Sequence, residues 1–181
     1  MSTDDATLLQ LISAGDRRAF EAFYRAYLPR LGRFLQRMLR RPQMVEEVLN
    51  DAMLVVWRTA ANFKGQSKVS TWVYSIAYHK ALKAMSKLDD PVEWDPDLLE
   101  SEQLEPERYL MQEQQTALLW GIVDEMSAEH RAVIELTYYH GYTYQEIADI
   151  TGCPINTVKT RMYHARRRLE SKLSERKQDF L

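Results

Sequence analysis

The sequence predicts an all-α protein with two small helical domains joined by an acidic linker. Apolar residues recur at intervals of three and four through most of the chain, which is the spacing of one helix face. Three prolines and a run of acids interrupt this pattern between Asp89 and Glu107. The 181 residues are enough for two domains that each bury a modest core. We expect the domains at residues 1–88 and 109–181, with the linker at 89–108.

The net charge of −2 hides a strong segregation of sign along the chain. Eight arginines and one acid lie in residues 17–41, and nine acids and no base lie in residues 89–107. From Lys159 to Lys177 the chain is basic again. The composition, 45% hydrophobic and 28% charged, is that of a soluble globular protein. The charge blocks therefore predict two basic surfaces with an acidic connector between them.

Four helices are expected in the first domain. Gly15 ends the first helix, Asp16 caps the second and Pro42 opens the third. Pro29 lies inside the second helix, where proline should kink or split it. The expected helices run from Asp4 to Ala14, from Asp16 through Leu39, from Pro42 through Trp57 and from about Ser70 to Lys87, and residues 62–67 form a loop.

The second domain is expected to end in two helices with a tight turn between them. Thr143 is placed to cap the first of these helices, with Glu146 three residues later, and Gly152 ends it. Pro154 opens the second helix. Two helices precede this unit, one at residues 109–126 and one capped by Ser127.

The last helix has one apolar face, and its other faces are polar and basic. The apolar face consists of Ile155, Val158, Met162, Ala165 and Leu169. No acid occurs on this helix before Glu170. Such a helix can pack on one side and enter a DNA major groove with the other, because an α-helix fits that groove and base edges are distinguishable there. The alternative is a solvated basic face on an ordinary helical hairpin.

Several functions lack the residues that they need. Cys153 is the only cysteine, so neither an intramolecular disulfide nor a cysteine-based metal site is expected. His130, His140 and His164 fall on different predicted elements, and no nucleophile–base pair is evident. The N-terminus lacks the pattern of a signal peptide, and no apolar run is long enough to span a membrane. We expect a cytoplasmic protein without cofactor, metal, enzymatic activity or membrane contact.

The C-terminal unit resembles region 4 of bacterial RNA polymerase sigma factors of the extracytoplasmic-function (ECF) type. The matching residues are Ser127-Ala-Glu-His-Arg131, Tyr144-Gln-Glu-Ile-Ala148, Gly152 to Arg161 and Ala165 to Leu169. The N-terminal half is similar to region 2 of the same family. The matching residues there are Val45 to Val48, Asn50-Asp51, Trp57, Phe63-Lys-Gly65 and Thr71 to Ala77. Both halves occur in the family's order and spacing, with an unmatched linker between them.

This resemblance implies a role for each half. The third helix, with Glu46, Glu47, Asp51 and Trp57, would dock on the clamp coiled coil of the largest polymerase subunit. Residues 63–78 would capture the unpaired −10 strand, because basic residues follow a nucleic-acid backbone and aromatic rings stack on splayed bases. The −10 candidates are Phe63, Lys64, Lys68, Trp72, Tyr74 and His79. We expect Trp72 to be mostly buried.

By the same resemblance, the last helix would read the −35 element. Lys159, Thr160, Tyr163 and His164 would face base edges. Phosphate contacts are expected from Asn156, Thr157, Arg161 and Arg166 to Arg168. The chain departs from the family at His79, where asparagine is common, and at Ser75, where arginine is usual. These departures affect the −10 sequence preference and leave the class of interaction unchanged.

The resemblance thus implies an ECF sigma factor that binds core RNA polymerase and promoter DNA and helps to melt the DNA. Its acidic linker would run through the channel that nascent RNA later occupies. Such factors are usually silenced by an anti-sigma protein, often membrane-bound. One alternative is a helix-turn-helix regulator with an N-terminal dimerisation or sensor domain, which would bind duplex DNA without polymerase. Another is a helical interaction protein or small-molecule enzyme that uses Cys153 and a histidine.

Overall fold

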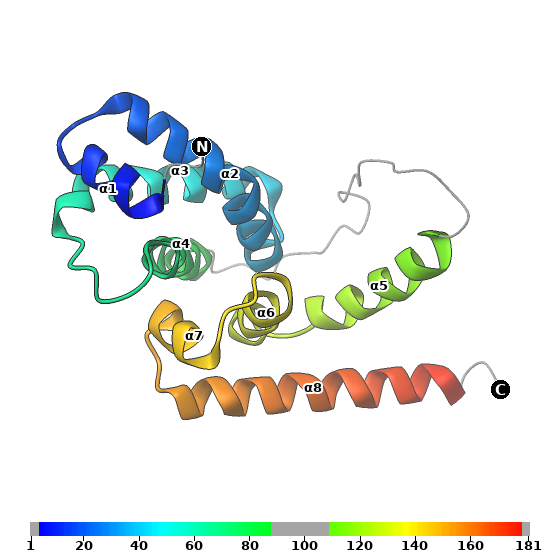
Figure 1. Ribbon diagram of the computed structural model, residues 1–181. Coiled ribbons are helices and arrows are strands. Elements are labelled where there is room, and N and C mark those ends of the chain that lie inside the picture. The colour runs from blue at the N-terminus through cyan, green and yellow to red at the C-terminus, as the bar shows by residue number, and fades with distance from the viewer. Residues whose placement is uncertain (1–3, 88–108, 179–181) are drawn as a thin grey trace.

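The computed structural model describes residues 4–87 and 109–178, in which every regular element is a helix (Figure 1). The helices are α1 (Asp5–Ser13), α2 (Arg17–Leu39), α3 (Pro42–Thr59), α4 (Val69–Ser86), α5 (Tyr109–Asp124), α6 (Ala128–Ile134), α7 (Tyr144–Thr151) and α8 (Ile155–Gln178). A short 3-10 turn, η1 (Ala60–Asn62), follows α3, and a π-helical turn, η3 (Glu135–Tyr139), follows α6. The predicted acidic linker lies outside the described residues. The all-α prediction is confirmed for the rest.

Helices α1 to α4 form the N-terminal half. The side chain of Asp16 caps α2 as predicted, because it accepts hydrogen bonds from the backbone N–H groups of Arg18 and Ala19 at 2.8 and 3.1 Å. Pro29 does not split α2, which continues from Arg17 to Leu39. On either side of the proline, Tyr27 and Leu31 are buried. Burial of the apolar face on both sides offsets the hydrogen bond that proline removes, a cost of about 3 kcal/mol in an unsupported helix.

The predicted ends of α7 are confirmed, whereas the predicted cap of α6 takes a different form. Thr143 and Glu146 form a reciprocal capping box, and Gly152 ends α7 with a φ of 67°. Ser127 precedes α6, but its hydroxyl makes no bond to the backbone of that helix. The hydroxyl instead lies 2.7 Å from His130 Nδ1 in a side-chain hydrogen bond. The Ser127 hydroxyl therefore bonds to the His130 ring and not to a backbone N–H group of α6.

The two halves are packed against each other and share one apolar core. Helix α4 lies on α7, and α2 lies on α6 (Figure 1). One continuous cluster of buried side chains contains Leu35 and Val73 from the N-terminal half together with Leu136 and Ile147 from the C-terminal half. A smaller cluster around Ile122 belongs to the C-terminal half alone. The sequence predicted both halves but not this packing between them.

A buried polar pair lies within this packed region. Glu135 on η3 is 1% exposed, and its Oε1 atom is 3.7 Å from His140 Nε2. Burial raises the pKa of Glu135 to about 7, although Arg37 and Arg33 act in the opposite direction. Burial also lowers the pKa of His140 to about 4. Both groups are therefore neutral near pH 6, where burying them costs least.

We predict that Glu135→Gln stabilises the fold more at pH 8 than at pH 5. The folded pKa of Glu135 lies above its unfolded value, so its favourable contribution is complete below about pH 4.3 and declines as the pH rises to about 7. The expected gain at pH 8 is about 1–3 kcal/mol in the free energy of unfolding. Urea denaturation at both pH values measures it, with the exposed Glu170→Gln as control. An equal gain at pH 5 and pH 8 would contradict the titration of Glu135.

Candidate nucleic-acid and polymerase interfaces

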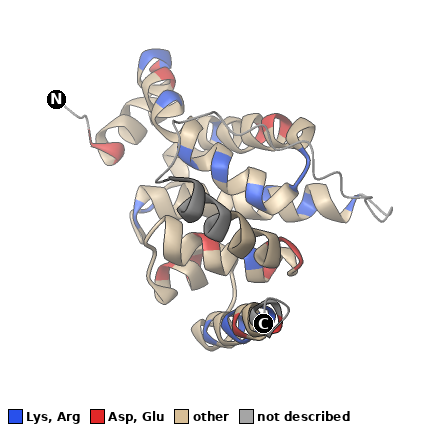
Figure 2. Ribbon diagram, turned by 90° about the vertical axis from the view of Figure 1, so that its right-hand side faces the viewer, with Lys and Arg blue, Asp and Glu red and all other residues tan. Residues whose placement is uncertain are grey.

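Helix α8 has the two-sided character that the sequence predicts. Val158, Met162 and Ala165 are buried against α6 and α7 or against the small cluster beside α5. The predicted reading residues Lys159, Thr160, Tyr163 and His164 are exposed on the other side. Figure 2 shows α8 nearly end-on with its lysines and arginines in blue. The helix therefore presents a polar and basic surface without disturbing its packing.

Some of the polar side chains on α8 are held in place by aromatic and sulfur neighbours. Arg166 Nε donates a hydrogen bond to the hydroxyl of Tyr138 at 3.0 Å. The guanidinium of Arg167 lies 5.8 Å from the centre of the Tyr163 ring. Arg161 Nη1 is 3.7 Å from the Sγ atom of Cys153. These contacts restrict the rotamers of the arginines and so reduce the entropy that they would lose on binding a phosphate.

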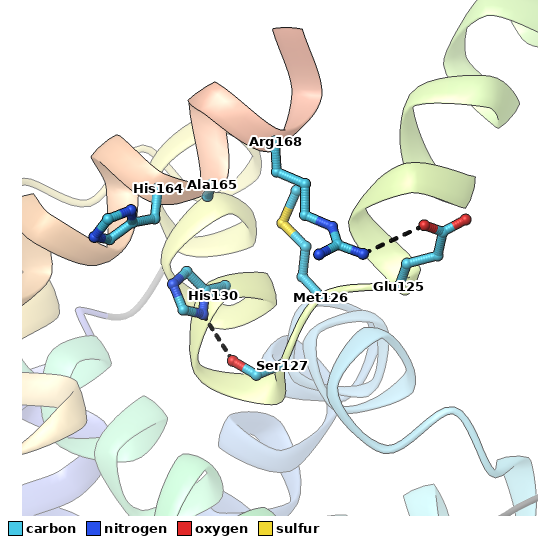
Figure 3. A pocket seen from close by; sticks show the side chains of 7 residues that line it. All are labelled: Glu125, Met126, Ser127, His130, His164, Ala165 and Arg168. Atoms are coloured by element: carbon cyan, nitrogen blue, oxygen red, sulfur yellow. Dashed lines mark hydrogen bonds and ion pairs between the residues drawn. The ribbon is translucent and has the colours of Figure 1, made fainter. Parts of the chain in front are cut away.

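A pocket of about 480 Å³ lies between α8 and the start of α6 (Figure 3). It is lined by Glu125, Met126, Ser127, His130, His164, Ala165 and Arg168. At its edge, Arg168 Nη2 is 3.5 Å from Glu125 Oε2. A neighbouring hollow of about 380 Å³ shares His130 and His164 and extends along Asn156, Thr157, Thr160 and Arg161. Of the predicted −35 residues, Asn156, Thr157, Thr160, Arg161 and His164 thus line the second hollow.

His130 lines both hollows, although it was not among the DNA-binding residues predicted from the sequence. Burial lowers its pKa, and the nearby Arg161 acts in the same direction, so the ring is neutral at pH 7. A neutral imidazole can donate or accept a hydrogen bond, unlike the arginines around it. This placement could not be predicted from the sequence, because His130 lies on α6 and is near α8 only through the tertiary fold.

The predicted −10 residues fall into an exposed group and a covered group. Lys64 and Lys68 are exposed, and His79 is exposed on α4. Phe63 is partly buried, and its ring centre lies 5.2 Å from that of Trp72. Trp72 is partly exposed and packs against the apolar core, which agrees with the expectation that it is mostly buried.

Tyr74 belongs to the covered group, and the structure does not leave it on an accessible −10 surface. Its side chain is fully buried, and its hydroxyl lies 3.1 Å from His140 Nδ1 in a hydrogen bond between the two halves. Its ring also packs against those of Phe34 and Tyr142. Sequence alone could not show this, because helical spacing does not reveal that α4 is packed on two sides.

The predicted polymerase-docking residues lie on α3. Glu46, Glu47 and Asp51 are exposed, and Asp51 pairs with Lys80 at 3.5 Å. Trp57 is partly buried and contacts the ring of Phe20 edge-on, with centroids 5.1 Å apart. Three residues after Asp51, Leu54 is 43% exposed and was not among the predicted residues. Leu54 thus adds an exposed apolar side chain near the acids of this helix.

No group of three metal-ligating side chains is found within residues 4–87 and 109–178. In the same part of the chain, none of the helices has the length and apolar character needed to cross a membrane.

Both halves of the chain match models of known protein families. The family described as "Sigma-70 region 2" matches residues 23–90, and "Sigma-70, region 4" matches residues 116–169. The chain is 26% identical over 180 residues to RNA polymerase sigma-H factor of Pseudomonas aeruginosa, covering 93% of each chain. It is equally identical to ECF RNA polymerase sigma-E factor of Escherichia coli K12, covering 93% of this chain and 94% of the relative.

Two solved structures are similar over most of the chain. The sigma factor RpoE in complex with the anti-sigma factor NepR, from Bartonella quintana, has a TM-score of 0.63 and 25% identity, covering 86% of this chain and 96% of that one. CnrH in complex with the cytosolic domain of CnrY has a TM-score of 0.68 at 18% identity, covering 94% and 97%, and shows a common fold. Both sigma regions occur here in order. The chain therefore belongs to the sigma-70 family and is an ECF-type sigma factor, a non-enzymatic factor that recognises promoters in transcription initiation.

Proposed function

We propose a division of labour in which residues 1–88 dock on core RNA polymerase and hold the −10 element, while residues 109–181 read the −35 element. Residues 89–108 connect the two domains. The observation that carries this proposal is α8, whose buried apolar face and exposed basic face belong to the half that matches region 4. The match of residues 23–90 to region 2 supports the role of the other half.

For the −35 element, we assign different tasks to different residues of α8. Lys159, Thr160, Tyr163 and His164 are exposed and contact base edges in the major groove. Phosphates are bound by Asn156, Thr157, Arg161 and Arg167. His130 adjoins the same surface and adds a neutral hydrogen-bonding group. This assignment places the readers near the start of α8, where a recognition helix contacts bases.

For the −10 element, the assigned contacts are Phe63, Lys64, Lys68, Trp72 and His79. The lysines follow the phosphates of the unpaired strand, and the partly exposed pair of Phe63 and Trp72 offers a ring on which a base can stack. Restacking of a base favours the closed duplex by a few kcal/mol per step. Binding of the unstacked base offsets this energy and so stabilises the melted strand.

The polymerase surface consists of Glu46, Glu47 and Asp51, with Leu54 among them. Trp57 supports this surface from behind through its contact with Phe20. Exposed acids suit a basic partner, since complementary charge speeds encounter and fixes register.

The same role gives the chain a cytoplasmic location, where the chromosome and the polymerase are found, with no membrane contact of its own. It also makes an anti-sigma protein a partner. The structure of RpoE with the anti-sigma factor NepR, 25% identical to this chain, supports that assignment.

We predict that the chain co-elutes with bacterial core RNA polymerase in gel filtration and that Glu47→Ala/Asp51→Ala weakens this binding. Both carboxylates are exposed, so their removal leaves the fold intact. Glu21→Ala removes an exposed acid from α2 and is the control. If the double variant binds like the control, α3 is not the docking helix. Tight binding of duplex DNA by the free chain, without binding to polymerase, would instead favour a conventional regulator.

We also predict that Lys159→Ala weakens binding of the holoenzyme to its best −35 sequence by about 1–3 kcal/mol and relaxes the preference at one base pair. Arg167→Ala should weaken binding to every sequence by a similar factor and reduce the salt dependence. Competition binding against a panel of single-base −35 variants measures both effects. An equal loss for Lys159→Ala across the whole panel would show that this lysine contacts only phosphate.

A further inference from the structure

One histidine lies where the two hollows beside α8 meet. His130 is on α6, and it lines both the pocket next to Arg168 and the hollow that extends along Thr160 and Arg161. Helix α6 packs against α8, and the histidine is partly buried there. Every other residue that lines the second hollow was assigned to −35 DNA above. His130 is therefore placed to meet the DNA that α8 binds.

The hydroxyl of Ser127 orients the His130 ring. It lies 2.7 Å from Nδ1, and the other ring nitrogen, Nε2, is on the side that faces α8 (Figure 3). A hydroxyl can donate to the Nδ1 atom of a neutral ring or accept from the Nδ1–H group of an imidazolium. The contact with Ser127 is thus compatible with both protonation states. In both of them Nε2–H is left as a donor toward α8.

Charged groups around the ring disfavour its protonated form in the free chain. Burial is the largest cause of the lowered pKa of His130, and three groups of α8 act in the same direction: Arg161, His164 and Arg168. The neighbouring Glu129 on α6 acts in the opposite direction. Glu125, which follows α5, pairs with Arg168 at 3.5 Å. The pKa of His130 therefore lies below the ordinary value of about 6.5.

Bound DNA would change this balance of charge. Duplex DNA carries one negative charge for about every 1.7 Å of its axis. A phosphate beside Arg161 offsets the positive charge that disfavours the proton on His130. The phosphate also accepts a stronger hydrogen bond from an imidazolium than from a neutral ring, because the donor is then charged. Both effects raise the pKa of His130 in the complex.

We propose that His130 takes up a proton when the −35 domain binds DNA and contacts a backbone phosphate as an imidazolium, so that the affinity for duplex DNA increases as the pH falls. The proposal rests on the −35 role of α8 proposed above. A group whose pKa is higher in the complex than in the free chain contributes its full affinity below the free-chain pKa. That contribution is lost as the pH rises through the pKa of the complex.

Nuclear magnetic resonance tests the proton uptake directly in the unaltered full chain. The chain has four histidines, so the ring C–H resonances are few, and His130→Gln identifies the one from His130. The probe is a mixed-sequence duplex of about 20 base pairs at low salt, since phosphate contacts do not depend on base sequence. We expect the pKa of His130 to be higher by about one pH unit with the duplex than without it. An unchanged or lower pKa would overturn the proposal.

Fluorescence anisotropy with the same duplex measures the consequence for affinity. His130→Gln keeps a hydrogen-bonding side chain but cannot take up a proton. Between pH 8 and pH 6, we expect the unaltered chain to gain about three- to tenfold more affinity than this variant. His130→Lys, with a fixed positive charge, should bind more tightly than His130→Gln at pH 8 and gain as little at pH 6. Equal gains in the unaltered chain and His130→Gln would overturn the proposal.

Glu170→Gln is the control for charge on α8. It removes an exposed carboxylate of the same helix that lies outside both hollows. Its affinity should change with pH by the same factor as that of the unaltered chain. A loss of the pH dependence in this variant would show that the effect does not come from His130.

Failure of the underlying −35 assignment gives a different result. His164 is exposed on α8, and its resonances report whether the duplex occupies that helix. If they shift while the titration of His130 stays the same, the −35 assignment is retained and the proton uptake is overturned. If neither histidine responds to the duplex, α8 does not bind DNA, and both the −35 assignment and this proposal fail.

Discussion

One buried cation, together with a shared apolar core, joins the two halves of this sigma factor. Arg131 donates to three backbone carbonyls, two of which belong to the end of α2 in the other half. A desolvated guanidinium is costly unless its donors are paired, and the last carbonyls of a buried helix are costly unless they find donors. The guanidinium of Arg131 and the last carbonyls of α2 can pair with each other only when the two halves are in contact. Separation therefore requires water, polymerase or another partner to replace these bonds.

The packing has unequal consequences for the two proposed DNA-binding surfaces. On α8, Tyr163 is 56% exposed, and the basic face is available while the molecule is closed. On α4, Tyr74 is buried, and Lys68 is paired with an acid. The proposed −35 surface is thus exposed in this arrangement, whereas part of the proposed −10 surface is covered. This difference in exposure suits a factor that binds the melted strand only after it has bound polymerase.

Features that depend on nearby residues could be predicted from the sequence. The cap at Asp16, the capping box of Thr143 and Glu146, and the left-handed Gly152 each involve only a few neighbouring positions. The apolar face of α8 follows from helical spacing, and motifs in both halves pointed to the family. Contacts between distant segments could not be predicted. Tyr74 and His140 are 66 residues apart, and Arg131 reaches a carbonyl 93 residues away, so neither local propensity nor periodicity indicates them.

The two halves share one apolar core in the free chain, and we expect them to separate when core RNA polymerase binds. The most direct test of this expectation is resonance energy transfer between dyes on Arg25→Cys in α2 and Glu170→Cys in α8, both exposed positions, with Cys153→Ser to remove the native thiol. We predict high transfer in the free chain, low transfer after core RNA polymerase is added, and low transfer in free Arg131→Met. Low transfer in the free, unaltered chain, or transfer that polymerase does not change, would contradict the account.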